Sequence, residues 1–322
     1  MSRGSNGNGV DEYNLALRAA WLHYAGGLTQ AAVGRRLCLT SMKTHRLIAR
    51  AVADGAVKVS IDGDIVECLE MEAALSERYG LRVCEVAPDL AEPGLPLRAL
   101  GIAGASYLGR LIEQSGVGPI GLGHGRTLAS AVGNLPHRAA DNIRFVSLLG
   151  GLTRSFAANP HDVMHRIAER TESAAHIMPV PFCANSVHDR SVLLAQRGVR
   201  EVFDMAQSAP VKLVGLGAVD ARAQLIRTGM IDKSELAGIV ETGAVGEVLG
   251  HFFDAAGQQV ATPLDGRTLA VSLLDSTAGD LVAIAGGVEK EASIAAVLES
   301  RKLTGLIIDE ATSRRILRRP AA

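Results

Sequence analysis

A chain of 322 residues, of which 48% are hydrophobic and 21% charged, is long enough for one small and one large domain with a packed core. Its net charge of −1 excludes a uniformly basic nucleic-acid coat, and no run of about 18 apolar residues indicates a membrane span. Residues 1–10 are rich in Gly, Ser and Asn and are expected to be disordered. The four cysteines match no zinc spacing, which favours free thiols in a reducing cytoplasm.

Residues 11–66 have the pattern of a helix-turn-helix DNA-binding domain. Apolar periodicity and capping residues predict three helices, over 11–25, 30–36 and about 41–54. Thr29 is a suitable N-cap for the second helix, and either Thr40 or Ser41 for the third. The break of three residues between the last two helices is typical of a helix-turn-helix. A hairpin over 56–66 is expected to follow as a small wing.

The third helix is expected to read DNA. Residues 35–58 hold six Lys or Arg against one acid, and such side chains contact phosphates or guanine edges. The residues predicted to contact operator DNA are Thr29, Gln30, Thr40, Ser41, Met42, Lys43, His45 and Arg46. The alternative at this stage is an ordinary three-helix cap with a solvated basic face.

A helix over 67–80 is expected to link this domain to a larger one at 81–322. Short apolar runs alternate there with helical patterns, which predicts an α/β domain with a doubly wound, mostly parallel sheet. The expected strands are 82–87, 119–123, 143–149, 176–180, 212–216, 282–285 and 304–308. The expected helices between them include 97–114, 162–171, 201–207 and 290–299.

Glycine-rich turns follow several of the expected strands. The run PIGLGHGRT at 119–127 leads from an apolar strand into such a turn and then a helix, whose N-terminus can face an anion. Three further runs, at 147–154, 243–254 and 285–290, also place glycines beside polar residues. Ligands of doubly wound sheets bind at the carboxyl ends of the strands. These runs therefore predict a polar pocket that includes Arg126, Thr127, Glu247, Asp254 and Lys290.

Two other kinds of ligand are disfavoured by the same residues. A dinucleotide site needs an acid at the end of the next strand, whereas Asp141 stands before that strand. His161 and His165 could share a helix face, but no carboxylate or cysteine completes a metal site. Neither a cofactor nor a metal is therefore expected.

The run at 27–57, GLTQAAVGRRLCLTSMKTHRLIARAVADGAV, resembles the DNA-binding segment of SorC-type sugar-binding transcriptional regulators. Two residues depart from the family. Cys38 stands where the turn usually has Gly, so a left-handed conformation there costs about 1 kcal/mol. Thr44 replaces a usual aliphatic residue. Residues 211–254 and 262–313 look like the effector domain of the same family.

This resemblance has further implications. The effector domain of the family is similar in fold to sugar-phosphate isomerases, and the assemblies are tetramers. Effector contacts are implied at Gly123, Gly125, Arg126, Thr127, Glu247 and Lys290, with His124 where many relatives carry an aromatic residue. Within the family, the chain looks most like the regulators of erythritol catabolism.

Taken together, these patterns predict a transcriptional regulator of a sugar or polyol operon, and a repressor is favoured over an activator. The expected effector is a small sugar, polyol or sugar phosphate of four to six carbons, and its phosphorylation is left open. Because operators are usually palindromic, at least a dimer is expected. One alternative is an isomerase-like enzyme with an added N-terminal domain, and another is an oligomeric binding protein without DNA affinity. The helix-turn-helix favours the regulator.

Overall fold

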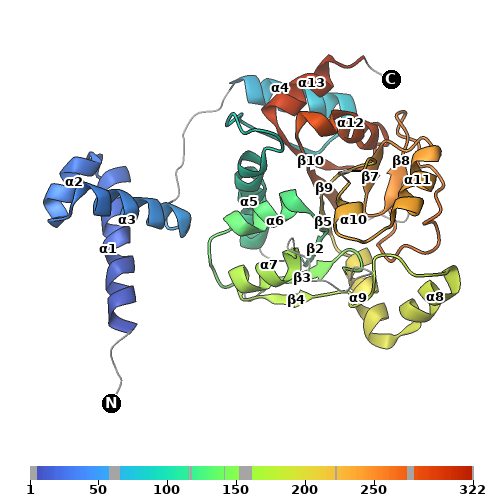
Figure 1. Cartoon of the computed structure of the whole chain (residues 1–322), viewed down its shortest axis with the longest axis horizontal. Coiled ribbons are helices and arrows are strands. Elements are labelled where there is room, and N and C mark those ends of the chain that lie inside the picture. The colour runs from blue at the N-terminus through green and yellow to red at the C-terminus, as the bar shows by residue number, and fades with distance from the viewer. Residues whose placement is uncertain are drawn as a thin grey trace. The chain divides into compact units, whose positions relative to one another are not determined.

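The computed structural model describes eight ranges of the chain, namely residues 6–57, 66–114, 116, 118–140, 142–151, 162–221, 223–273 and 279–320. The chain divides into two compact units, Met1–Gly63 and Asp64–Ala322 (Figure 1). Most of the hairpin expected over 56–66 lies outside the described residues. Across the described ranges, no helix is long and apolar enough to cross a bilayer.

The smaller unit is a three-helix domain, formed by α1 (Asn6–Tyr24), α2 (Gln30–Leu37) and α3 (Ser41–Ala53). α1 begins earlier than expected, so residues 6–10 are helical rather than disordered. Each residue added to an existing helix gains a backbone hydrogen bond, which explains how a polar segment can extend it. The core of the unit is small and consists of Ala16, Ala19, Ala20, Leu22, Val33, Leu47, Ile48 and Ala51.

The turn between α2 and α3 has the conformation that the sequence suggested. Thr40 caps α3, and its hydroxyl accepts from the backbone N–H of Lys43 at 3.3 Å. Cys38 is left-handed, with φ of 55° and ψ of 41°. A Cβ at Gly34 would lie 3.0 Å from the Thr44 hydroxyl oxygen, so glycine lets the two helices approach. Of the two residues that depart from the SorC-type pattern, Cys38 therefore lies in the turn and Thr44 at the helix contact.

The larger unit alternates strands and helices. Its first half contains α4 (Val66–Tyr79), β1 (Val83–Ala87), α5 (Leu97–Glu113), β2 (Pro119–Leu122), α6 (Arg126–Asn134), β3 (Arg144–Ser147), α7 (Val163–Thr171), β4 (Ala174–His176), α8 (Val187–Ala195) and α9 (Arg197–Gln207). Its second half contains β5 (Val211–Val214), β6 (Gly217–Ala218), α10 (Gln224–Arg227), α11 (Lys233–Glu241), β7 (Gly246–Val248), β8 (His251–Phe253), β9 (Asp280–Ile284), the 3₁₀ turn η1 (Val288–Lys290), α12 (Glu291–Glu299), β10 (Gly305–Asp309) and α13 (Glu310–Arg318).

Seven strands form one parallel sheet in the order β1-β10-β9-β5-β2-β3-β4. Six of the expected strands overlap their counterparts closely, whereas the strand expected over 176–180 shares only His176 with β4, and residues 177–180 are not part of the sheet. Successive residues point to opposite faces: Val282 and Ile284 pack with α5, α6 and α7, while Leu281 and Ala283 join the core on the other face. Figure 1 shows α5, α6 and α7 side by side on their face of the sheet. The architecture is therefore doubly wound.

Two features of the larger unit were not expected. β6, β7 and β8 form a small antiparallel sheet, whose strands of two or three residues are too short for a periodic pattern to show. α4 packs against β1 and α13, so the helix expected as a linker belongs to the larger unit. Arg78 of α4 supports this contact, since its guanidinium donates to the carbonyl oxygens of Arg319 at 2.8 Å and Pro320 at 2.7 Å.

Candidate functional site

The exposed face of α3 carries the residues expected to contact DNA. Its buried side consists of Thr44, Leu47, Ile48 and Ala51, which pack inward. The predicted residues Ser41, Met42, Lys43, His45 and Arg46 are all exposed, and Met42 is 85% exposed. Thr29 and Thr40 cap the two helices, and Gln30 is half-buried at the start of α2. The helix-turn-helix therefore presents these groups together.

Arg46 and Arg50 lie close to one carboxylate on α1. Their guanidinium nitrogens lie 3.4 and 3.5 Å from the carboxylate oxygens of Glu12. All three side chains are well exposed, so each ion pair contributes little to stability. Arg46 is therefore held only weakly by Glu12.

A second candidate site lies where the chain leaves three neighbouring strands. β9, β5 and β2 are adjacent in the sheet, and their carboxyl ends meet two adjoining cavities of about 40 and 280 Å³. From β2 and β5 the chain proceeds toward opposite edges of the sheet, which is the position where doubly wound folds bind ligands. Both cavities share the lining residues Arg126, Gly217, Gln224 and Lys290.

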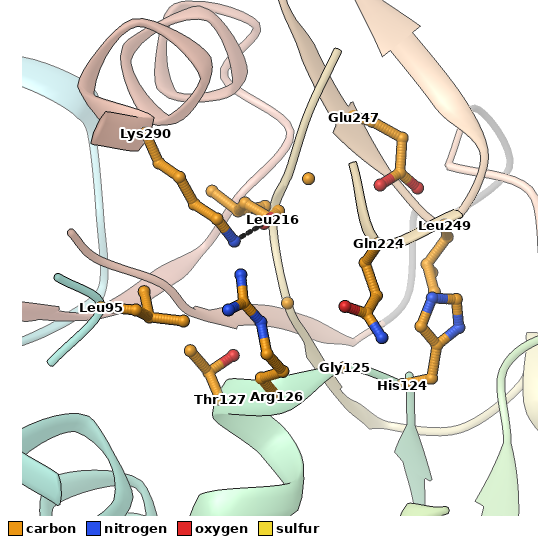
Figure 2. Close-up of a pocket in the computed structure, with 12 residues that line it drawn as sticks. Leu95, His124, Gly125, Arg126, Thr127, Leu216, Gln224, Glu247, Leu249 and Lys290 are labelled. Atoms are coloured by element: carbon orange, nitrogen blue, oxygen red, sulfur yellow. Dashed lines mark hydrogen bonds between the residues drawn. The ribbon is translucent and has the colours of Figure 1, made fainter. Parts of the chain in front are cut away.

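Lys290 reaches the pocket from η1, the turn after β9. Its ammonium group donates to the carbonyl oxygen of Leu216 at 3.0 Å. Burial lowers the pKa of Lys290, and the nearby positive charge of Arg126 lowers it further. Figure 2 shows the two cationic side chains approaching each other from η1 and from the start of α6. An anionic group between them would relieve this repulsion.

Glu247 enters from β7 and is 7% exposed. One of its carboxylate oxygens accepts from the backbone N–H of Gly250 at 2.7 Å. Burial raises the pKa of Glu247 to about 7, against the opposing effects of this hydrogen bond and of Lys290. A Cβ at Gly217 would lie 2.2 Å from its other oxygen, so glycine makes room for the carboxyl group. Near neutral pH this group can therefore donate or accept a hydrogen bond.

The start of α6 forms the floor between these groups. Gly125 precedes the helix with φ of 120° and provides no side-chain cap, so the first N–H groups of α6 are left for a ligand. Thr127, which was expected to contact the effector, donates its hydroxyl to the carbonyl oxygen of Ile284 at 2.8 Å. His124 lines the smaller of the two cavities and packs edge-on against Phe182.

Two predicted residues, and the described part of one predicted run, do not contribute side chains to this pocket. Asp254 lines neither cavity, because its carboxylate accepts from the backbone N–H groups of Ala256 and Gln258 and closes a turn. Gly123 lies behind the lining residues, where its N–H donates to Leu213. The run 147–154 is described only as far as 151, and its Gly150 packs tightly against the carbonyl oxygens of Val180 and Pro181.

Comparison with known proteins agrees with this two-part arrangement. The Sugar-bind family model, which represents a sugar-binding domain, matches residues 63–318. The erythritol catabolism regulatory protein EryD of Brucella abortus (strain 2308) is 59% identical over 307 residues, which cover 95% of this chain and 97% of that protein. The chain belongs to the SorC-type family of sugar-binding transcriptional regulators.

Other SorC-type relatives match over nearly the whole chain. The transcriptional regulator LsrR of Klebsiella pneumoniae is 31% identical over 321 residues, with 97% of this chain and 95% of that protein covered. The crystal structure of the full-length sorbitol operon regulator SorC from Klebsiella pneumoniae superimposes with a TM-score of 0.74 at 25% identity, over 95% of this chain and 98% of that one. The predicted family, fold class and regulatory function are thus confirmed.

Sequence reasoning missed several lining residues of this SorC-type regulator. They are Leu95, Gly215, Leu216, Gly217, Gln224 and Leu249 in the smaller cavity, and Asp220 and Arg227 among those of the larger one. The run VGLGAVD at 214–220 has the same strand-then-glycine pattern as the turns that were recognised, so it could have revealed Gly215 and Gly217. Within the described ranges, no cluster of three His, Cys, Asp or Glu side chains could hold a metal ion.

Proposed function

We propose that this regulator is a repressor that binds a palindromic operator through α3. Binding of a small sugar or polyol beside Lys290 and Glu247 would lower its affinity for the operator. The observation that supports this most is the pocket at the ends of β2, β5 and β9, where two cations face a carboxyl group of raised pKa. A dimer follows from operator symmetry, and a tetramer is the assembly that the family resemblance implies.

The chemistry of the lining suits a small ligand rich in hydroxyl groups. Gln224, Glu247 and exposed backbone groups can each donate to or accept from a hydroxyl, while Lys290 and Arg126 favour an anionic group. We infer a ligand of four to six carbons. Erythritol or a phosphate of erythritol is the leading candidate, because the Brucella relative named for erythritol catabolism is 59% identical.

We further propose that the protein binds this ligand without transforming it. The relatives are transcriptional regulators, and a sugar-phosphate isomerase has no use for a DNA-binding domain. The protein would then act in the cytoplasm, on operator DNA, with no cofactor. An enzyme assay with four- to six-carbon aldose phosphates should accordingly show no isomerisation above background.

A calorimetric titration tests the proposed ligand. The panel contains erythritol, erythritol phosphate, ribitol and ribitol phosphate, with a nucleotide as the control. We expect at least one member of the four-carbon pair to bind, and the preferred form decides whether the cations hold a phosphate. Saturation at 100 times the dissociation constant should stabilise the folded protein by about 2.7 kcal/mol. Binding of the nucleotide alone would contradict the proposed class of effector.

A comparison of two lysine variants tests whether the ligand binds in this pocket. Lys290→Ala should strongly weaken binding of the preferred ligand while leaving it measurable, because the ammonium group lies in the cavity wall. Lys233→Ala removes an exposed lysine from the first turn of α11 and should bind like the wild type. Equal affinities in the two variants would show that the ligand binds elsewhere.

A further inference from the structure

We infer that Asp309 is a positioning residue of the effector site, which holds the turn that carries Lys290. This inference rests on the proposed function of that site. Asp309 is the last residue of β10, the strand next to β9, and is 4% exposed. It lines neither cavity, so any effect on the effector must pass through the turn.

The two carboxylate oxygens of Asp309 serve different segments. One oxygen accepts from the backbone N–H of Gly287 at 2.8 Å, and the other caps α13 by accepting from the N–H of Thr312 at 2.9 Å. The hydroxyl oxygen of Thr312 also accepts from Gly287, at 2.9 Å. The N–H of Gly287 thus lies between two acceptors at the start of α13. The turn after β9 is held at this peptide.

Gly287 passes this constraint on to Lys290. The carbonyl oxygen of Gly287 accepts from the backbone N–H of Lys290 at 2.8 Å, which closes η1. Gly287 has φ of 96°, a conformation that other residues rarely adopt. The preceding Gly286 allows the close approach, because a Cβ there would lie 2.0 Å from the carboxylate of Asp309. A flexible lysine stem therefore starts from a fixed backbone.

Comparison with another helix cap separates positioning from simple capping. α7 and α13 are both nine-residue helices with an aspartate N-cap. One oxygen of Asp162 accepts from both Met164 and His165 of its own helix, at 2.9 and 3.1 Å. In Asp309, by contrast, one oxygen accepts from its own helix at Thr312 and the other accepts from Gly287, in the turn that carries Lys290. Only the contact to Gly287 can influence the position of Lys290.

The first test measures the turn without any ligand. Asp309→Asn keeps the shape of the side chain but replaces one acceptor oxygen with a donor group. The single remaining oxygen is uncharged and must serve both Gly287 and Thr312, so the bond to Gly287 weakens and hydrogen exchange at residues 286–290 should become at least tenfold faster than in wild type. Asp162→Asn should leave exchange at 286–290 unchanged. Wild-type exchange at this turn in Asp309→Asn would overturn the inference.

The second test is a double-mutant cycle with the preferred ligand of the erythritol and ribitol panel. Asp309→Asn should weaken that ligand about tenfold, as expected for residues coupled in one hydrogen-bonded network. In the Lys290→Ala background the same change should cost less than about twofold. Equal losses in both backgrounds would overturn the inference, because a general structural effect adds to that of Lys290→Ala.

Two further variants keep the test decisive. If Asp309→Asn does not fold, Thr312→Val removes the other acceptor of Gly287, and Thr312→Ser should restore it. Faster exchange at 286–290 in the valine variant and rescue in the serine variant support the inference, and no difference between them contradicts it. If the wild type binds no member of the panel, the proposed function fails, and the exchange measurements alone decide the role of Asp309.

Discussion

Thr127 donates its hydroxyl group to the carbonyl oxygen of Ile284 at 2.8 Å and so ties the start of α6 to the end of β9. Arg126 precedes Thr127 on α6, and Lys290 follows Ile284 on the turn after β9. The bond therefore fixes the distance between the two elements that bring cations to the pocket. Thr127, which was expected to contact the effector and lines the smaller cavity, thus also holds the two sides of the site together.

Replacing Thr127 with valine should test this role. The variant keeps the shape of the side chain but removes a buried hydrogen bond, which should lower the free energy of unfolding by about 1 kcal/mol. Thr127→Ser keeps the hydroxyl and should lie closer to wild type. Urea unfolding of the three proteins provides the comparison. Equal stability of the valine variant and wild type would show that the bond does not contribute.

Glu247 should make the stability of the protein depend on pH. Its pKa is raised from 4.5 to about 7 in the folded state. Between these values the unfolded chain loses a proton that the folded chain retains, so the free energy of unfolding falls as pH rises. At about 1.4 kcal/mol per pKa unit, the full effect is about 3 kcal/mol. Below about pH 4.5 the carboxyl is protonated in both states and contributes no pH dependence.

Glu247→Gln removes the titrating group and should remove this dependence. Denaturant unfolding at pH 5 and pH 7.5 should show a larger loss of stability for wild type than for the variant. A loss of the same size in both proteins would mean that another group is responsible. The comparison is made without effector, since a bound anion would itself change the titration.

Lys43 and Arg46 should contribute to DNA binding rather than to folding. Both are exposed on α3, so alanine at either position should leave the unfolding midpoint nearly unchanged. A lost phosphate contact should lower the salt slope of operator binding by about 1, and a lost base contact should cost about 1–3 kcal/mol and relax specificity. Fluorescence anisotropy over a range of salt concentrations measures both. Unchanged operator affinity in both variants would contradict the assignment.

Cys38→Gly should stabilise the small unit. Cys38 is left-handed in the turn between α2 and α3, where a side chain costs about 1 kcal/mol and glycine does not. The gain should be smaller than this value, because glycine also gives the unfolded chain more freedom. Thermal unfolding of the full chain with a probe on α1 would measure it. A lower melting temperature for the glycine variant would contradict the claim that Cys38 is strained in this turn.

The central strands of the sheet were predictable because they are buried on both faces, whereas the edge strand β4 is partly exposed and was placed poorly. The buried strands appear in the sequence as short apolar runs, and Leu281–Ile284 and Leu306–Ile308 are examples. β7 was not recognised as a strand, since Gly246–Val248 is too short to show a period. Its partner β8 has the same length. Pairing between such short segments depends on the fold and not on local sequence.

The candidate site was predictable only in part. Arg126, Glu247 and Lys290 were found because each stands beside a glycine-rich turn. The same rule wrongly included Asp254, whose carboxylate is used by its own turn. It also missed Asp309, because a carboxylate that acts through a neighbouring backbone leaves no signal in local sequence. Proximity in the chain thus located the pocket but could not assign every role.

Operator binding with and without effector tests the central claim most directly. The preferred ligand of the erythritol and ribitol panel should lower the operator affinity of wild type at least tenfold at saturation, as a coupling of about 1.4 kcal/mol requires. The Lys290→Ala variant should bind the operator like wild type and show no response at the same ligand concentration. A variant that releases DNA at the wild-type concentration would contradict the claim that the effector acts through this pocket.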